Sequence, residues 1–433
     1  GGGCLFRGCI PSKALLHVAK VLSDAKAAKN FGVEFPTPKI NLNKVRSWKT
    51  DVVAKLTGGL SQLCRQRKIN FIQGRASFVA SNSLKIQRSN GTTETLNFEH
   101  TIIATGSRPA TLPNLPQNSS RILDSTSALE VTDIPKSLLI VGGGYIGLEL
   151  GTVYAELGSR VSVVEMTSGL LPGTDRDLAE VLTKRLKGLF EAIWLNAKVV
   201  GMEETPPAMK VTIQEENRQE TQKEFQKVLV SVGRKPNTEG LSLENTKVGV
   251  DERGFIKVNG QRRTTDPSIF AIGDVAGEPL LAHKASHEGR VAAEAIAGGK
   301  TAFEPKAIPA VVFTDPEIAW CGLTEAEAAK QNRPVQVVKF PWAASGRAIT
   351  LDRMEGLTKL MIDPQTERIL GVAIAGVGAG ELIAEGVLAV EMGSVASDVR
   401  LSIHPHPTLS ETVMESAESF FGQSTHMYKP RPK

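Results

Sequence analysis

Cysteine is scarce in this chain, which has only four in 433 residues: Cys4, Cys9, Cys64 and Cys321. A secreted protein held together by disulfides needs a denser set, so the sequence excludes that class. The count fits a reducing compartment in which one cysteine pair has a function. Cys64 stands in a basic helical context and Cys321 follows a tryptophan, and we expect both to be inert packing thiols.

Long apolar runs and concentrated charge are also missing. No apolar run reaches the roughly 18 residues that a membrane-spanning helix needs. The net charge of +5, from 51 basic and 46 acidic residues, is too dilute to indicate nucleic-acid binding, and no basic cluster is interleaved with aromatics. With 41% hydrophobic and 22% charged residues, the composition is that of a globular protein, and the length suggests two to four domains.

The first motif is the cysteine pair. Cys4 and Cys9 have four residues between them, and apolar residues recur at helical spacing from residue 10 to residue 22, with Pro11 in the first turn. Cys9 is therefore expected near a helix N-terminus, where the dipole favours a thiolate. A disulfide across so short a loop adds little stability, so the pair is either a redox couple or two buried thiols.

Hydrophobic periodicity and turn residues divide the rest of the chain. We expect a mostly helical region over residues 10–68, then strands at 70–72, 76–79, 83–87 and 101–106. Residues 135–257 are expected to form an α/β unit, with strands at 137–141, 161–164 and 228–233 and a helix at 148–157. A strand is predicted at 269–272, mixed strands and helices follow from 307, and the polar tail 425–433 is expected to be loose.

The second motif is a glycine fingerprint. Gly142, Gly144 and Gly147 follow a buried strand and open a helix, and Glu165 ends the next strand. This pattern is typical of dinucleotide binding, in which the pyrophosphate lies at the helix N-terminus. Glu165 would accept hydrogen bonds from a ribose diol and repel a 2′-phosphate, so the motif indicates NAD rather than NADP. The alternative is a glycine-rich turn without a ligand.

The third motif places a carboxylate five residues after an imidazole. His406 and Glu411 lie across an expected strand-to-helix corner, where the acid could orient the histidine as a general base. Glu411 could instead be only a helix N-terminal acid. His404 would point the opposite way on a strand and is expected to be structural. Asp274, after an apolar strand, could bind a ligand hydroxyl, and no further ligands at metal spacing accompany it, so no metal is expected.

The combination of these motifs resembles the flavoprotein disulfide reductases, and within them the members that oxidise dihydrolipoamide. The resemblance covers essentially the whole chain and rests on residues 8–17, 56–60, 104–109, 142–149, 232–237, 271–274, 281–285, 340–347 and 404–411.

The resemblance implies a fold class, α/β, with two Rossmann-like nucleotide-binding domains and an α+β dimerisation domain. The implied boundaries are an FAD-binding domain at 1–134, an NAD-binding domain at 135–257, a return to the FAD or central domain at 258–306, and an interface domain at 307–433.

The resemblance also implies roles for individual residues. His406, oriented by Glu411, would deprotonate dihydrolipoamide, whose thiolate attacks a Cys4–Cys9 disulfide, with Cys4 as the interchange thiol and Cys9 against the flavin. For FAD it implies contacts from Lys13, Gly74, Ala76, Thr105, Gly106, Glu149, Asp274 and Ala282, with Lys13 paired to Glu149. For NAD it implies Gly142, Gly144, Gly147, Glu165, Val199 and Gly233.

The implied partners are a second copy of the chain and the lipoyl domains of 2-oxoacid dehydrogenase complexes. In the homodimer, the His406–Glu411 pair would act on the other subunit. No nucleic acid or membrane partner is expected. The pattern is similar to bacterial cytoplasmic members, with an organellar location left open.

The sequence departs from the family in one respect. It starts at the cysteine motif and without methionine, so the glycine fingerprint that binds the ADP half of FAD is not in it. We therefore expect an N-terminally truncated chain, or else one that binds FAD poorly. Two alternatives stay open: another NAD(P)H-dependent disulfide reductase of glutathione or mercuric type, and a non-catalytic fragment without flavin.

Overall fold

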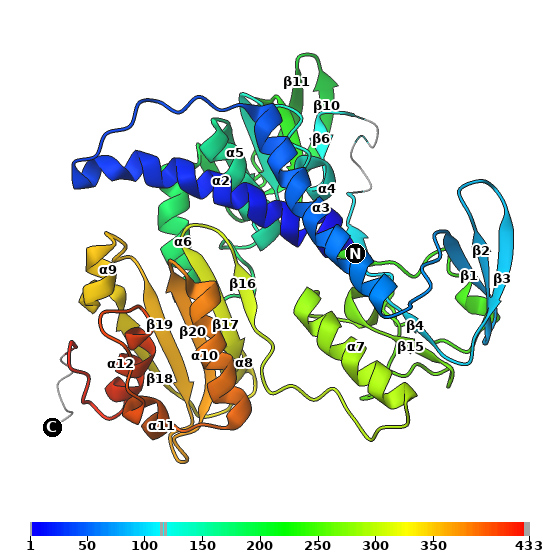
Figure 1. Cartoon of the computed structure of the whole chain (residues 1–433). Helices are drawn as coiled ribbons and strands as arrows, with labels where there is room; N and C mark the ends of the chain where they lie inside the picture. Colours follow the sequence, from blue (N-terminus) through cyan, green and yellow to red (C-terminus); the bar gives the residue numbers. More distant parts are fainter. Residues whose placement is uncertain (1, 113–115, 117–118, 428–433) are drawn as a thin grey trace. The chain divides into compact units, whose positions relative to one another are not determined.

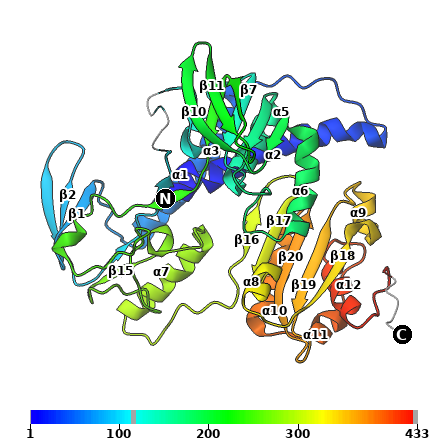
Figure 2. The same cartoon turned by 180° about the vertical axis from the view of Figure 1, so that it is seen from behind.

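The computed structural model describes residues 2–112, 116 and 119–427. Within it the chain forms two compact units, each built from separate stretches of sequence (Figures 1 and 2). The first unit contains Gly1–Pro11, Asn43–Thr111 and Gly233–Glu304, and the second contains Ser12–Leu42, Leu112–Val232 and Pro305–Lys433. The four-domain division expected from the sequence stays a prediction.

The N-terminal region is helical, as predicted. Helix α1 (Gly3–Arg7) ends before Gly8, and α2 (Cys9–Ala27) starts at the second cysteine, with a 3-10 turn, η1 (Ala28–Phe31), after it. Helix α3 (Leu42–Gln66) also lies in the region expected to be mostly helical. The strand predicted at residues 70–72 is wrong, because this segment pairs with no strand among the residues that the structure describes, and Phe71 is 81% exposed.

The first unit contains three small sheets. Strands β1 (Arg75–Ala80), β2 (Ser83–Gln87) and β3 (Thr93–Asn97) form an antiparallel meander. Strand β4 (Thr101–Ile103) pairs in parallel with β15 (Ile269–Ala271), and β5 (Ser107–Pro109) pairs antiparallel with β14 (Arg234–Pro236). The short helices η2 (Leu243–Asn245) and η3 (Gly273–Ala276) and the longer α7 (Ala282–Ile296) complete the unit, and Figure 1 shows α7 beside the β4–β15 pair. Phe270 of β15 packs against Ala292 and Ala295 of α7.

A five-stranded parallel sheet forms one part of the second unit. Its order is β6-β13-β7-β8-β9, and the strands are β6 (Ile122–Leu123), β13 (Lys227–Val230), β7 (Ser137–Val141), β8 (Arg160–Val164) and β9 (Ala192–Trp194). Its helices are α4 (Ser125–Ala128), α5 (Tyr145–Leu157) and α6 (Arg176–Leu189). A small antiparallel sheet of β10 (Lys198–Thr205), β11 (Ala208–Gln214) and β12 (Glu220–Phe225) packs on it. The strand–glycine turn–helix order that the sequence predicts at residues 137–157 is confirmed.

The C-terminal part of the second unit is a five-stranded antiparallel sheet. Its order is β16-β17-β20-β19-β18, and the strands are β16 (Ala310–Val312), β17 (Glu317–Gly322), β20 (Ile369–Gly376), β19 (Leu357–Ile362) and β18 (Gln336–Pro341). Its helices are α8 (Glu325–Lys330), η4 (Trp342–Ala344), α9 (Gly346–Thr350), α10 (Ala379–Met392), α11 (Ala396–Leu401) and α12 (Glu411–Phe420). Helix α10 covers β17 and β20, and α12 covers β18 and β19 (Figure 1).

The fold is therefore mixed α/β, as expected. Among the residues that the structure describes, no helix combines the length and apolarity that crossing a bilayer requires.

Candidate active site

Cys4 and Cys9 form a disulfide, with their Cα atoms 4.7 Å apart. Gly8 makes the short loop possible, because a side chain there would lie 3.1 Å from the Gly3 carbonyl oxygen and 3.3 Å from Cys4 Cα. Both cysteines are half-buried, so reagents can reach the bond. This geometry excludes the alternative of two packed thiols and leaves a reducible pair at the start of α2.

The remaining cysteines are free thiols. Cys321 is buried in the β17 strand, and burial raises the pKa of its thiol to about 12. Such a thiol is not ionised at neutral pH and does not react as a nucleophile. Cys64 is half-buried on α3.

The structure brings Lys13 and Glu149 together. The Lys13 ammonium lies 2.9 Å from Glu149 Oε2, and Ser12 Oγ donates to the same oxygen at 3.1 Å. The backbone N–H of Phe313 donates to Oε1 at 3.0 Å, and the Phe313 ring centre lies 4.3 Å from the Lys13 ammonium. Glu149 is only 3% exposed, and a buried carboxylate is stable when charged donors and hydrogen bonds surround it in this way.

Glu165, the acid expected to complete the glycine fingerprint, forms a hydrogen bond to the backbone of the fingerprint turn. Glu165 Oε2 accepts a hydrogen bond from the Gly143 backbone N–H at 2.6 Å, and Oε1 accepts one from Thr167 at 2.7 Å. A side chain on Gly147 would come within 2.6 Å of the Gly142 carbonyl oxygen, so packing requires glycine there. Packing does not require it at Gly144, where a side chain would meet no atom within 4 Å.

This difference between the glycines fits a dinucleotide. Gly144 is the N-cap of α5, no side chain caps that helix, and the space that a side chain at Gly144 would fill is open. A pyrophosphate could approach the N-terminus of α5 there. Val199 of β10 packs against the cluster that contains Val164. Gly233 lies in the first unit with φ +113°, and a side chain there would meet no atom within 4 Å.

The residues expected to bind FAD are divided between the two units. In the first, Asp274 accepts a hydrogen bond from Ser107 Oγ at 2.5 Å. The preceding Gly106 has a left-handed backbone (φ +70°), and a side chain added there would meet no atom within 4 Å. Thr105 Oγ1 donates to the Asn237 carbonyl at 2.7 Å, and Ala282 is the exposed first residue of α7, which no side chain caps.

Two of the residues expected to bind FAD, Gly74 and Ala76, lie at the meander. A side chain on Gly74 would come within 2.6 Å of Ile86, so packing alone accounts for that glycine, and Ala76 follows on β1. Lys13 and Glu149 belong to the second unit. The open backbone around Gly106 and the uncapped start of α7 fit a phosphate-containing group.

His406 and Glu411 form the expected pair. His406 Nδ1 lies 2.9 Å from Glu411 Oε1, and the Thr408 backbone N–H donates to Oε2 at 2.7 Å. Burial alone would raise the pKa of Glu411, but the Thr408 and His406 hydrogen bonds outweigh it, so this pKa lies below its usual range. The ionised carboxylate holds Nδ1–H and leaves Nε2 of the 70% exposed imidazole as a proton acceptor.

The strand expected before Glu411 is wrong. Residues 402–410 form a loop between α11 and α12, since this stretch pairs with no strand of the sheet. Within the loop, His404 Nε2 lies 2.7 Å from Glu385 Oε1 and Nδ1 lies 2.8 Å from the Ser402 carbonyl oxygen. The side chain is 8% exposed, which is consistent with the structural role expected for it.

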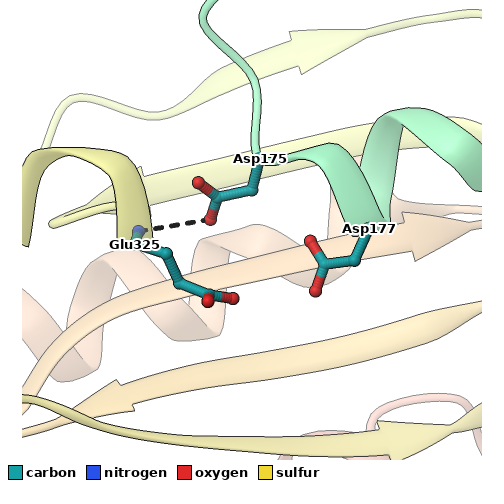
Figure 3. A group of neighbouring side chains, drawn as sticks. All are labelled: Asp175, Asp177 and Glu325. Atoms are coloured by element: carbon teal, nitrogen blue, oxygen red, sulfur yellow. Dashed lines mark hydrogen bonds between the residues drawn. The ribbon is translucent and has the colours of Figure 1, made fainter. Parts of the chain in front are cut away.

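An acidic cluster of Asp175, Asp177 and Glu325 was not visible in the sequence (Figure 3). The ammonium of Lys359, a fully buried side chain of β19, lies 2.6–2.9 Å from an oxygen of each acid. Lys339 of β18 also pairs with Asp177, at 2.6 Å. The cluster is thus an ion-pair network that joins α6 and α8 to the antiparallel sheet.

Comparison with protein families gives two matches. Residues 1–289 match the pyridine nucleotide-disulphide oxidoreductases, and residues 308–417 match the dimerisation domain of the same group. Dihydrolipoyl dehydrogenase of Vibrio cholerae is 47% identical over 433 residues, covering 100% of this chain and 91% of the relative. The Haemophilus influenzae protein of that name is 48% identical, with 100% and 90% covered.

Solved structures give the same relationship. LpdA from Mycobacterium tuberculosis superposes with a TM-score of 0.89 at 25% identity, covering 97% of this chain and 91% of that one. The HOCl-induced flavoprotein disulfide reductase RclA from Escherichia coli has a TM-score of 0.85 at 29% identity, with 96% and 91% covered. A reducible cysteine pair, a fingerprint turn open to a dinucleotide and these matches have one explanation: the chain belongs to the pyridine nucleotide-disulphide oxidoreductases.

Proposed function

We propose that the chain is a dihydrolipoyl dehydrogenase, which oxidises dihydrolipoamide to lipoamide and reduces NAD⁺ to NADH. The observation that carries the proposal is the Cys4–Cys9 disulfide at the start of α2, in a chain 47% identical over its whole length to an enzyme of that activity. The balanced reaction converts a dithiol and NAD⁺ into a cyclic disulfide, NADH and one proton.

His406 starts the reaction by accepting a proton at Nε2 from one thiol of dihydrolipoamide. The resulting thiolate attacks Cys4 Sγ, the Cys4–Cys9 bond breaks, and Cys9 leaves as a thiolate. The second substrate thiol then attacks the substrate sulfur of the mixed disulfide and passes its proton to the departing Cys4 sulfur. This step releases lipoamide and leaves Cys4 as a thiol, Cys9 as a thiolate and one proton on His406. Glu411 holds the imidazole in the tautomer with Nδ1–H and stabilises the cation that forms.

FAD, when bound, carries the electron pair from the two cysteines to NAD⁺. We assign Thr105, Gly106, Asp274 and Ala282 to its binding, with Gly74 and Ala76 at the adenine and Lys13 and Glu149 at the ring. For NAD⁺ we assign the Gly142–Gly147 turn, Glu165 at the ribose, and Val199 and Gly233. The open turn at Gly144 and the short Ser107–Asp274 hydrogen bond support these assignments.

The match to a dimerisation domain supports a homodimer. In this proposal the His406–Glu411 pair of one subunit serves the disulfide of the other, and lipoyl domains of 2-oxoacid dehydrogenase complexes deliver the substrate. The low cysteine count and the bacterial relatives favour the bacterial cytoplasm.

A test compares two reactions of the flavin-loaded protein. Dihydrolipoamide with NAD⁺ should produce NADH, whereas NADPH with glutathione disulfide should react at least a hundredfold more slowly. His406→Gln should lower dihydrolipoamide turnover by two orders of magnitude or more, as loss of a general base does, while NADH-to-ferricyanide electron transfer stays near its original rate. Preference for glutathione disulfide, or equal loss of both activities in the variant, would contradict the proposal.

A further inference from the structure

A second histidine–glutamate pair lies one helical turn from the first. Glu411 and Glu415 are four residues apart on α12 and therefore share a face of that helix. His426 Nδ1 lies 2.5 Å from Glu415 Oε1, just as His406 Nδ1 lies 2.9 Å from Glu411 Oε1. The two pairs are therefore built alike and stand side by side.

The second pair anchors the chain that follows α12. Ser424 Oγ donates to Glu415 Oε2 at 2.5 Å, and the backbone N–H of His426 points at the same oxygen from 3.5 Å. The expectation of a loose tail is thus wrong for residues 425–426, whereas residues 428–433 lie outside the described part. Glu415 has a side chain only 4% exposed, and a carboxylate so deeply buried is costly without such partners.

A charge on His426 acts on the first pair. A positive charge on His426 helps to lower the pKa of Glu411, after the larger effects of burial, Thr408 and His406. Glu418 of α12 and Arg400 of α11 add charges of opposite sign nearby. The pKa of Glu418 is raised by burial and by Glu415, and lowered in part by Arg400 and by His426.

We propose that Glu415 and His426 are positioning residues, which hold the C-terminal segment on α12 and set the electrostatic environment of the His406–Glu411 pair. The proposal rests on the function proposed above, in which His406 is the base. When it is protonated, His426 supplies a positive charge that offsets the negative charge of the buried Glu415, so that the pair as a whole adds little net charge beside Glu411 and His406. Either partner, when removed alone, leaves the other's charge unbalanced beside the base.

The two single substitutions must therefore have opposite effects. His426→Gln leaves the negative charge of Glu415 one turn from Glu411, so His406 should hold its proton to higher pH. Glu415→Gln removes that negative charge, retains the shape and leaves His426 in place, so His406 should lose its proton at lower pH. For charges separated by one or two helical turns near a protein surface, each shift should be on the order of a few tenths of a pH unit.

The experiment follows the imidazole titration of His406 by NMR in the full protein, with its signal among the seven histidines identified by its loss in His406→Gln. We expect the titration midpoint, and the acid limb of the pH profile of kcat/KM for dihydrolipoamide, to rise in His426→Gln and fall in Glu415→Gln. His426→Arg, which keeps a positive donor, should restore the original midpoint. Midpoints that move in the same direction, or do not move, would overturn the proposal.

The NMR titration separates this proposal from the proposed function. It needs no turnover, so opposite shifts of the His406 midpoint would support the electrostatic role even in a protein that does not oxidise dihydrolipoamide. Full activity with unchanged midpoints would instead leave the proposed function standing and remove Glu415 and His426 from it.

Discussion

Lys13 and Glu149 form an ion pair of 2.9 Å although 136 residues separate them in the sequence. Lys13 follows the second active-site cysteine by one turn of α2, and Glu149 lies in the first half of α5, the fingerprint helix. The pair therefore joins the helix that starts at the disulfide to the helix that starts at the dinucleotide turn. Phe313 contacts both partners, because its backbone N–H donates to Glu149 and its ring lies against the Lys13 ammonium.

The first prediction concerns the reactivity of Cys9. Residues four apart on a helix are neighbours, so the Lys13 ammonium should favour the Cys9 thiolate once the disulfide is reduced. Lys13→Met should slow alkylation of Cys9 at neutral pH by roughly three- to tenfold, because a lost neighbouring cation raises a thiol pKa by about half a unit to one unit. Peptide mapping after timed alkylation measures this rate. Lys13→Arg is the control and should react like the original protein, and equal rates in all three proteins would refute the role of the charge.

The second prediction concerns the choice of dinucleotide. Glu165→Gln keeps the shape and one acceptor oxygen for the Gly143 and Thr167 N–H groups but removes the charge that would repel a 2′-phosphate. The ratio of kcat/KM for NAD⁺ to that for NADP⁺ should fall by about tenfold, which corresponds to about 1.4 kcal/mol. Glu191→Gln, at an exposed acid just before β9, should leave the ratio unchanged. An unaltered ratio in Glu165→Gln, with unaltered thermal stability, would remove Glu165 from the ribose site.

The third prediction concerns the Lys359 network. Lys359→Met leaves Asp175, Asp177 and Glu325 without their buried cation, which should lower the free energy of unfolding by about 3–5 kcal/mol. Lys339→Met is a matched control, because Lys339 contacts two of the same acids from a half-exposed position and such pairs contribute about 0–1 kcal/mol. Urea denaturation of the three proteins measures the difference. Similar losses in both variants would mean that burial does not distinguish the two lysines.

The same network gives stability a pH dependence. Burial opposes ionisation of Asp177, but hydrogen bonds from Lys339 and Lys359 hold its pKa below the ordinary 3.8. Burial likewise disfavours charged Lys359, but its hydrogen bonds to Asp175, Glu325 and Asp177 raise its pKa above the ordinary 10.5.

The Asp177 contribution is therefore present above pH 3.8 and lost as the pH falls through the lower, folded value. The Lys359 contribution is present below pH 10.5 and lost as the pH rises through the higher, folded value. The stability difference between the original protein and Lys359→Met should be constant between these limits and shrink outside them. Denaturation at a series of pH values measures it, and a difference that grows in acid would contradict this account.

Local patterns in the sequence were sufficient for the parts of the site that lie close together along the chain. The Cys4–Cys9 spacing, the fingerprint turn with Glu165, and the His406–Glu411 pair all span short stretches, and the structure forms each of them. The Lys13–Glu149 contact is long-range, and only the family resemblance indicated it. Local patterns failed where strand formation depends on a partner strand: residues 70–72 were predicted as a strand, but they pair with no strand in the described part of the chain.

The Lys359 network and the Glu415–His426 pair could not be predicted, for different reasons. Lys359 meets Asp175 across 184 residues, and an isolated lysine in a strand carries no sign of burial. Glu415 and His426 are only 11 residues apart, but a polar, basic tail has the composition of a solvated segment. In both cases the decisive fact is that a charged side chain, Lys359 or Glu415, is buried, which depends on packing rather than on spacing.

The central claim is that Cys4 and Cys9 are a redox couple between dihydrolipoamide and NAD⁺. The most direct measurement treats the flavin-loaded protein with one equivalent of dihydrolipoamide, quenches with an alkylating reagent, and identifies the labelled cysteines by mass spectrometry. We expect new label on Cys4 and Cys9 and unchanged label on Cys64 and Cys321, and we expect prior addition of excess NAD⁺ to prevent the new label. Label that NAD⁺ does not remove, or a disulfide that dihydrolipoamide leaves intact, would contradict the account.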